Sequence, residues 1–515
     1  MADKAIGDRK LRFDILNSPL CTRIIAELTS CNKDSSEHVL RRCEGSEPEE
    51  NGRLPHRGRG LPNISDSVYR LAMTTQLRGL TPVITQTRGH FGRILSEVLS
   101  PSRPLHSPEF LRGRQEQLDG IEKALYSAGR HVFIHGFRGV GKSSLAQTAA
   151  YGMSTGGMDP IVIGCDKNST FGSAMRDMFD EAVSKNPRIA ATITENGLAF
   201  GNLGATIGRK ITTHEGRIAE PGSINEAVRL TKFLCENFTS NPVVVIDEFD
   251  QLQSREEQGN FANFIKQISD RHIPARFIFC GIGESVDAIM AAHGSADRYF
   301  HTVKLGQLPY DARNEIIRIA AQRLGIEIDD TTVYRIAKIS DGFPHYVHLL
   351  SEKLFWRVYE AENEGRVTGD LFQLAMSDAS DAMEMKLKQP YETATRKYTN
   401  DYESLLWAVA DGHELQRSSR DIYASYVRIM KSQELEPLQR EKFNARINNL
   451  KKPSYAAILS ATRQGWYEFS EKVIRGYARL RAEQKDVQLE VDHPALKSKL
   501  RSTAGAPSIF RESGF

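Results

Sequence analysis

The chain has 515 residues, of which 40% are hydrophobic and 26% are charged, and its formal net charge at pH 7 is +3. This length is sufficient for two or three domains, each with its own core. The small net charge excludes a polycation, so any contact with nucleic acid must come from a local basic surface. No apolar run approaches the roughly 20 residues that cross a bilayer, and the N-terminus lacks a secretory pattern. Six cysteines without a C-x-x-C pair favour free thiols, and together these features predict a cytoplasmic protein with no membrane partner.

The N-terminal part of the chain is polar and contains many residues that break regular structure. Residues 1–75 mix charges of both signs and are predicted to be disordered. Residues 76–108 are interpreted as a linker, because several prolines interrupt their second half. An amphipathic helix is expected next, with Leu118, Ile121 and Leu125 on one face.

Between residues 109 and 306, short apolar runs alternate with helical patterns. One run precedes Gly136, and the others are Ile161–Cys165, Val243–Ile246, Phe277–Cys280 and Thr302–Leu305. Strands that alternate with helices indicate an α/β domain, in which helices cover both faces of a parallel sheet. The stretch from about 189 to 221 is rich in Gly, Thr and Asn and has no helical period, so it is interpreted as an insertion.

The run that precedes Gly136 leads into a glycine-rich loop with the pattern G-x-x-x-x-G-K-[ST]. The residues expected to contact a nucleotide are Gly136, Phe137, Arg138, Gly139, Val140, Gly141, Lys142, Ser143 and Ser144. Glycines allow backbone N–H groups to point at phosphate oxygens, and the start of the following helix adds partial positive charge. Lys142 is placed to reach the β- and γ-phosphates, and the Ser143 hydroxyl to bind Mg²⁺. This spacing predicts a site for a nucleoside triphosphate.

A second strand ends in two carboxylates, Asp247 and Glu248. The ligand crevice of such a sheet lies outside the carboxyl ends of its strands, where these side chains would emerge. Asp247 is expected to hold Mg²⁺ together with Ser143, and Glu248 to orient and deprotonate an attacking water. Lys142, Asp247 and Glu248 are therefore the candidate catalytic residues of this chain.

These residues together resemble the AAA+ ATPases, and in particular the replication initiators of the origin-recognition kind. The resemblance covers about 105–365, with the ATPase core at 109–306 and a helical lid at 307–365, and continues more weakly to about 490. It implies ATP and Mg²⁺ as ligands, and it implies that Arg114 lies near the adenine.

The same resemblance assigns two further residues. Arg298, just before the last strand, stands where the family supplies an arginine finger to a neighbouring subunit, and the alternative is an ordinary surface arginine. In the lid, His345 stands where the family has a sensor arginine that reaches the γ-phosphate. Hydrolysis is therefore expected to be slow or dependent on a partner.

Residues 366–490 are interpreted as a winged helix, and residues 491–515 as a flexible tail. Three helical patterns follow residue 400, and two possible wing strands follow at 455–459 and 465–469. The polar and basic residues expected to face DNA are Arg440, Lys442, Asn444, Arg446, Asn448, Asn449, Lys451, Lys452, Arg463, Arg475, Arg479 and Arg481. Such a third helix can enter the major groove while its basic neighbours bind phosphates.

The sequence thus predicts an ATP-hydrolysing molecular switch that binds duplex DNA through its C-terminal domain. An arginine finger in trans implies a homo-oligomer or a partner ATPase subunit. A different class stays open, because fold does not fix function. It is a signalling or scaffold NTPase of the STAND kind, such as a phage-defence component, whose C-terminal domain binds protein.

Overall fold

The computed structural model divides the chain into two units, Met1–Leu80 and Thr81–Phe515, and all described residues lie in the second. The described residues are 87–101, 111–154, 159–185, 220–237, 241–252, 254–292, 296–362, 364–383, 385–396 and 401–489. The predicted disordered segment, the C-terminal tail and nearly all of the predicted insertion lie outside them.

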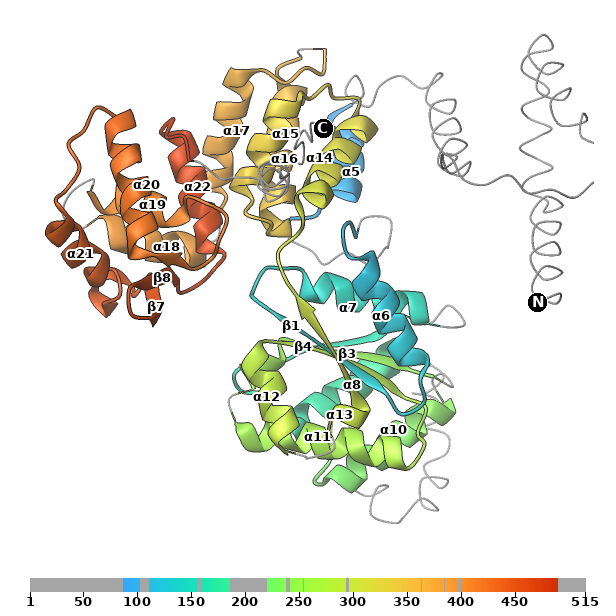
Figure 1. The fold of residues 1–515 in the computed structure, drawn as a ribbon. Helices are drawn as coiled ribbons and strands as arrows, with labels where there is room; N and C mark the ends of the chain where they lie inside the picture. The colour runs from blue at the N-terminus through green and yellow to red at the C-terminus, as the bar shows by residue number, and fades with distance from the viewer. Residues whose placement is uncertain are drawn as a thin grey trace, which may run out of the picture. The chain divides into compact units, whose positions relative to one another are not determined.

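A five-stranded parallel sheet forms the centre of the N-terminal half (Figure 1). Its strands are β1 (His131–Gly136), β2 (Ile161–Gly164), β3 (Val243–Asp247), β4 (Arg276–Gly281) and β5 (Phe300–Leu305). The order is β2-β3-β4-β1-β5, and every neighbouring pair is parallel. The predicted α/β class and all predicted strands of the sheet are confirmed. Because β4 separates β1 from β3, the loops that follow β1 and β3 border a crevice above the end of β4.

Helices cover both faces of the sheet, as Figure 1 shows. They are α6 (Gln115–Tyr126) and α7 (Lys142–Met153) on one face, and α8 (Phe171–Lys185), α10 (Ile224–Asn237), α11 (Arg255–Asp270) and α12 (Gly283–Ala292) on the other. Successive side chains of a strand point to opposite faces. Accordingly Val132 and Ile134 belong to the core beneath α6 and α7, whereas Phe133 belongs to a phenylalanine-rich core on the other face.

The layer between α7 and the sheet is built from small side chains. Ala146, Ala149 and Ala150 are fully buried there, next to Leu145. Alanine has no side chain beyond Cβ, so α7 lies close to the strands that it covers. The helix that begins at Lys142 is thereby fixed to β1, β3 and β4.

Four helices follow the sheet and form the lid region: α14 (Tyr310–Leu324), α15 (Asp330–Ile339), α16 (Pro344–Glu360) and α17 (Gly369–Asp381). Because α17 packs along α16, this helical layer continues past the expected boundary at 365. The expected linker at 76–108 also needs correction, since it contains α5 (Arg88–Val98). Phe91 of α5 packs against Trp356 and Tyr359 of α16, with ring centroids 5.1 and 4.3 Å away.

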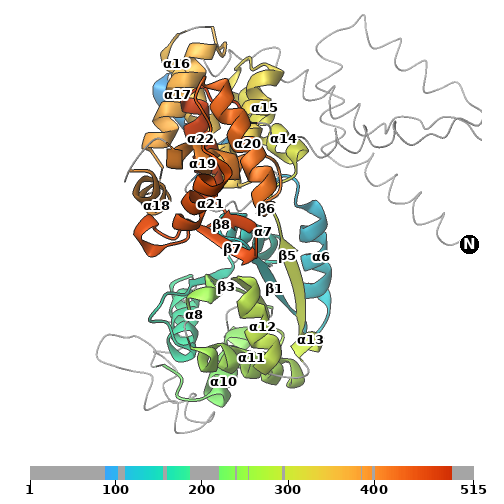
Figure 2. The same ribbon diagram turned by 60° about the vertical axis from the view of Figure 1, so that its left-hand side comes forward.

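Within the second unit, residues 385–489 form helices and a small antiparallel sheet, and this part of the chain is called the C-terminal unit below. Its elements are α18 (Met385–Thr395), α19 (Asp401–Ala410), β6 (Arg417–Ser418), α20 (Ser419–Ser432), α21 (Arg440–Asn449), β7 (Leu459–Arg463), β8 (Trp466–Phe469) and α22 (Ile474–Gln484). The strand order is β6-β8-β7. The three predicted helices are present, but β7 begins at Leu459 instead of 455, because a 3-10 turn at Pro453–Tyr455 precedes it. Figure 2 shows α22 alongside α17 of the lid region.

Candidate functional site

The loop between β1 and α7 has a conformation that requires glycine at three positions. A Cβ added to Gly136 would lie 2.2 Å from the carbonyl oxygen of Leu305, which leaves no room for a side chain. Gly139 and Gly141 have φ angles of 79° and 94°, in the region that glycine adopts at low cost. Gly141 is the residue directly before α7, so the loop presents the positive end of that helix.

A cavity of about 330 Å³ lies against this loop. Its volume is in the range of small-molecule and cofactor sites. The predicted site residues that line it are Arg114, Arg138, Gly139, Val140, Gly141, Lys142, Ser143, Ser144, Asp247, Glu248 and His345. Gly136 and Phe137 shape the loop without lining the cavity. The structure therefore brings residues from β1, β3 and the lid to one place.

Lys142 and the acidic pair line the same cavity, but Lys142 begins α7, after β1, whereas the acidic pair lies at the end of β3. The Lys142 ammonium group donates to the carbonyl oxygens of Gly136 and Phe137, at 3.2 Å each, which keeps the amine within the loop. Asp247 ends β3, and its Oδ1 accepts from the backbone N–H of Glu248 at 2.9 Å. Glu248 is exposed and has a φ of 52°, an uncommon backbone conformation for a non-glycine residue.

Arg114 braces the cavity wall from inside the protein. Its guanidinium donates to the carbonyl oxygens of Val140, at 3.2 Å, and Gly306, at 2.5 Å. Burial lowers the pKa of Arg114 to about 10, so the side chain is still charged at neutral pH. Besides lining the cavity, Arg114 connects the phosphate loop to the segment that joins β5 to the lid.

Two histidines of the lid and a short segment after α5 form another part of the wall. His345 Nδ1 donates to the carbonyl oxygen of Pro101 at 2.9 Å, while its Nε2 is buried without a hydrogen-bond partner among the described residues. The N–H of Ser100 donates to His348 Nδ1 at 3.3 Å, and burial lowers the pKa of His348 to about 4. Sequence reasoning missed Ser100, Pro101 and His348, because nothing in their spacing connects residues so far apart in the chain.

Arg298 lies away from this cavity. It is exposed on α13 (Ala296–Tyr299), which precedes the amino end of β5, whereas the cavity lies at the carboxyl ends of the strands. A six-residue strand such as β5 is about 20 Å long. Arg298 is therefore too far away to act on the cavity of its own chain.

The donor set of the cavity fits a nucleotide with Mg²⁺. The Ser143 hydroxyl and the Asp247 carboxylate both line the cavity, and Mg²⁺ prefers such oxygen ligands with the remainder supplied by water and phosphate. The N-terminus of α7 and the Lys142 ammonium group suit phosphate oxygens. No group of three or more His, Cys, Asp or Glu in the described part of the chain could hold a metal by itself.

The expected DNA-facing surface is smaller than the sequence indicates. Arg475 and Arg479 are only 1% and 3% exposed, so they cannot contact DNA in this arrangement. Arg446 and Asn449 both donate to the Tyr402 hydroxyl of α19, at 3.2 Å each, so these half-buried side chains are held against the C-terminal unit.

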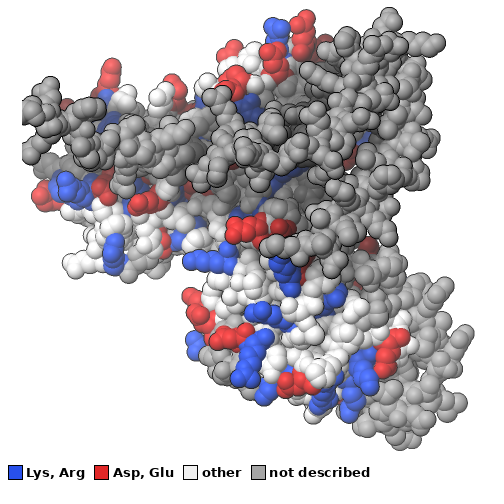
Figure 3. Space-filling view, turned by 45° about the vertical axis from the view of Figure 1, so that its right-hand side comes forward, with Lys and Arg blue, Asp and Glu red and all other residues white. Residues whose placement is uncertain are grey.

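Exposed cations remain at the start of α20, along α21 and in the β7–β8 hairpin: Arg420, Lys442, Lys452 and Arg463. The guanidinium of Arg463 lies 3.8 Å from the ring centroid of Trp466. On the described residues visible in Figure 3, basic and acidic side chains are interspersed.

The phosphate loop after β1, the acidic pair after β3 and the order of the parallel strands define a P-loop NTPase. Residues 111–275 match the model of the AAA ATPase domain, so this chain contains an AAA ATPase domain. The predicted membership of the AAA+ ATPases is thereby confirmed for the domain at residues 111–275.

Similar solved structures include three archaeal proteins. A Walker-type ATPase of Pyrococcus abyssi is 16% identical, with 74% of this chain and 99% of that chain covered and a TM-score of 0.41. The ORC2 protein of Aeropyrum pernix, in ADPNP–ADP complexes, is 12% identical, with 76% of this chain and 98% of that chain covered and a TM-score of 0.42. The ORC1 protein of the same organism, in complex with DNA, is 14% identical, with 73% of this chain and 95% of that chain covered and a TM-score of 0.37.

No curated protein matches this sequence. Among the described helices, none has both the length and the apolar character that crossing a membrane requires.

Proposed function

We propose that the protein is an ATP-binding and ATP-hydrolysing switch. The observation that carries this proposal is the convergence of Lys142, Ser143, Asp247 and Glu248 on one cavity at the carboxyl ends of β1 and β3. Lys142 would bind the β- and γ-phosphates, and Ser143 and Asp247 would hold Mg²⁺. The metal would neutralise charge that develops on the phosphate oxygens.

Glu248 is the proposed general base. It is exposed at the rim of the cavity, where a water can approach both its carboxylate and a bound phosphate. His345 at the opposite wall lacks the five fixed donors of an arginine. Slow hydrolysis, or hydrolysis that needs a partner, is consistent with this difference.

Arg298 is proposed to complete the site of a neighbouring subunit. Its exposure on α13, at the far end of the sheet from its own cavity, supports a role in trans over a role in cis. A contact in which one face of a subunit meets a different face of the next is heterologous, and it builds rings or filaments. The partner is a second copy of this chain or another ATPase subunit.

The C-terminal unit is proposed to be a winged helix that binds duplex DNA. Its support is the order of helices and strands and the exposed Arg420, Lys442, Lys452 and Arg463. Positively charged side chains beside a helix can bind phosphates on both sides of a groove. The scaffold alternative gains from the burial of Arg475 and Arg479, which reduces the basic surface. Binding of duplex DNA by the full chain, with and without ATP, separates the two.

Three variants test the nucleotide site. Lys142→Ala is expected to lose ATP binding, because no phosphate-facing ammonium group remains in the loop. Glu248→Gln is expected to bind ATP but to lose nearly all hydrolysis, because an amide cannot accept the proton. Lys304→Ala is the matched control, since Lys304 is exposed on β5 and does not line the cavity. Calorimetry and phosphate release measure the two steps, and unchanged ATP affinity of Lys142→Ala would exclude the assignment.

A further inference from the structure

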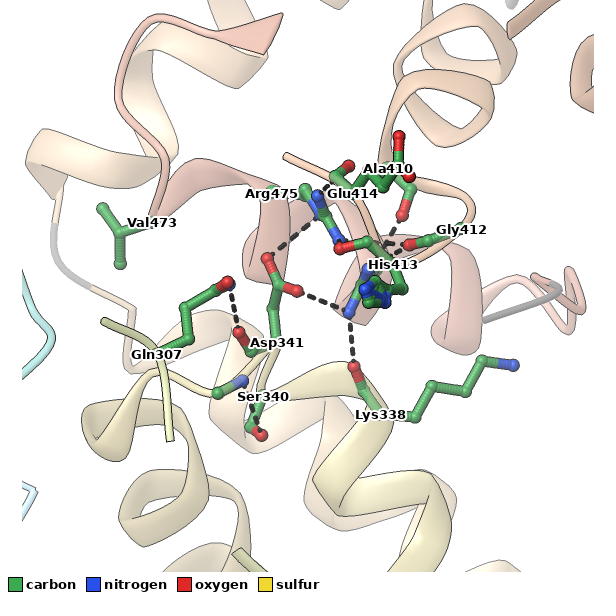
Figure 4. Close-up of polar contacts among 12 residues, drawn as sticks. Gln307, Lys338, Ser340, Asp341, Ala410, Gly412, His413, Glu414, Val473 and Arg475 are labelled. Atoms are coloured by element: carbon green, nitrogen blue, oxygen red, sulfur yellow. Dashed lines mark hydrogen bonds and ion pairs between the residues drawn. The ribbon is translucent and has the colours of Figure 1, made fainter. Parts of the chain in front are cut away.

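A buried ionic cluster connects the lid to the C-terminal unit. Asp341 lies between two arginines of α22, with Oδ2 3.1 Å from Arg475 Nε and Oδ1 2.8 Å from Arg479 Nη1 (Figure 4). All three residues are at most 4% exposed. Charges removed from water are costly unless they are paired, so removal of one partner would leave the other charge buried and uncompensated.

The two guanidinium groups are satisfied mainly by backbone carbonyls at the end of α19. Arg475 donates to the carbonyl oxygens of Gly412, His413 and Glu414. Arg479 donates to those of Ala410 and Gly412 and, across the boundary, to that of Lys338 in α15. Figure 4 shows the loop at 410–414 and Asp341 on different sides of Arg475. The arginines therefore join the 410–414 loop to the end of α15 and to Asp341.

Asp341 begins a turn that leads directly to the nucleotide cavity. Asp341 and Gly342 have φ angles of 51° and 76°, so the chain reverses sharply after α15. The N–H of Leu308 donates to the Gly342 carbonyl at 2.7 Å, which fixes the turn to the segment after β5. A Cβ added to Gly342 would lie 2.7 Å from Arg313 and 2.9 Å from the Leu308 carbonyl oxygen, so the packing there is close.

The turn and the C-terminal unit both contact the phosphate loop. A Cβ added to Gly139 would lie 3.5 Å from Phe343 of the turn and 3.5 Å from Val473, which directly precedes α22. The Tyr346 hydroxyl donates to the Val473 carbonyl at 2.9 Å. One surface of the phosphate loop is thus covered jointly by the lid and by the C-terminal unit.

We propose that Arg475 and Arg479 are positioning residues of the nucleotide site. Through Asp341 they set the position of the turn that packs on the phosphate loop, so nucleotide binding and docking of the C-terminal unit are coupled. Coupling between two sites is reciprocal: what the docked unit adds to nucleotide affinity, the nucleotide adds to docking. This inference rests on the proposed nucleotide site, but it goes beyond it, because neither arginine lines the cavity.

The test uses the full chain and the variant Asp341→Asn, which keeps the shape of the side chain but removes its charge. Affinity for a non-hydrolysable ATP analogue is expected to fall about 10-fold, within the usual range of coupling between sites. Hydrogen exchange measured by mass spectrometry supplies a second readout. In the wild type the analogue is expected to slow exchange of the amides at 410–414, which do not line the cavity. In Asp341→Asn this remote protection should be lost while the phosphate loop remains protected.

Lys485→Gln is the matched control. Lys485 donates to Glu403 at 2.5 Å within the C-terminal unit, so this variant breaks a partly buried ion pair without touching the turn or the 410–414 loop. It should keep wild-type ATP affinity and remote protection. Tyr346→Phe is the second test variant, for the case in which Asp341→Asn does not fold. It removes only the hydroxyl that donates to the Val473 carbonyl, and it should lower both the nucleotide affinity and the remote protection.

The possible results separate the two proposals. If the wild type binds no nucleotide, the proposed function fails. If it binds nucleotide, but Asp341→Asn or Tyr346→Phe, folded as judged by circular dichroism, retains full affinity and full protection at 410–414, the coupling is refuted. Loss of remote protection in Lys485→Gln as well would also refute it, because the effect would then be one of general stability.

Discussion

The exposed cations of the C-terminal unit predict how strongly its DNA affinity depends on salt. Each phosphate that a lysine or arginine neutralises contributes about −0.9 to the slope of log affinity against log salt concentration. Four exposed cations near the start of α20, in or just after α21 and in the β7–β8 hairpin are taken as the contacts, namely Arg420, Lys442, Lys452 and Arg463, and four contacts give a slope of about −3.6. Between 50 and 200 mM salt, the affinity should then fall about 150-fold.

Replacing Lys442 and Lys452 together by alanine removes two of the four contacts. The slope should decrease to about −1.8, so that the same increase in salt lowers the affinity only about 12-fold. Lys304→Ala is the control, because Lys304 is exposed on β5, outside the C-terminal unit, so its loss should leave the slope unchanged. The slope of log affinity against log salt concentration is measured by fluorescence anisotropy, with the full chain and a labelled duplex of about 30 base pairs.

Two results would refute this reasoning. The first is the absence of duplex binding at 50 mM salt, where phosphate contacts are strong. The second is a slope that the double variant shares with the wild type, which would place the contacts elsewhere on the chain. Either result would favour the scaffold alternative, in which the C-terminal unit binds protein.

Two further predictions concern the assembly and the core. Arg298→Ala protein mixed with Glu248→Gln protein should regain part of the ATPase activity that each lacks alone, because one interface then keeps both groups; failure at every mixing ratio would argue against a finger in trans. His131 Nδ1 accepts from the Phe277 N–H at 3.2 Å, and burial lowers the pKa of His131 to about 3. The folded core therefore keeps His131 neutral, whereas in the unfolded chain this side chain takes up a proton below its ordinary pKa of about 6.5. Stability is therefore lost as the pH falls, by about 2 kcal/mol between pH 7.5 and pH 5. Hydrogen exchange in β1 and β4 measures this loss, which His131→Gln should not show, and equal pH dependence of the two proteins would contradict the prediction.

The sequence predicts the sheet and the phosphate loop because both depend on local patterns. Buried parallel strands appear as short, continuous apolar runs, and β3, from Val243 to Asp247, is an example. Gly136 and Gly141 occur in the loop for steric reasons that act within a few residues or on one neighbouring strand. The α/β core and most of the cavity lining could therefore be predicted without a structure.

The burial of Arg475 and Arg479 could not be predicted in this way. A charged residue is usually at the surface, and its pairing with Asp341 depends on a contact between distant segments of the chain. The same helix also carries Arg481, Glu483 and Gln484, so its sequence does not distinguish the two buried arginines from those at the surface.

Helix α5 was missed for a different reason. Its buried residues Phe91, Leu95 and Val98 recur at helical spacing, but the prolines that follow them in the sequence are typical of a linker. The cavity contacts of Ser100 and Pro101 depend on the path of the chain after that helix. Neither residue type has a chemical property that would identify it as part of a nucleotide site.

The layer of alanines beneath α7 limits how the sequence of this domain can vary. Substitution of Ala146 or Ala149 by a larger residue would lift the helix from the sheet, since the close-packed interior has no space for additional atoms. The loop before the helix cannot follow such a shift, because Gly136 is held against Leu305 by steric contact. On the opposite face, the aromatic side chains around Phe133 can exchange volume with one another without moving the loop. Sequence change in the core is therefore expected to accumulate on the phenylalanine side, while the alanine side keeps the thickness that the phosphate loop requires.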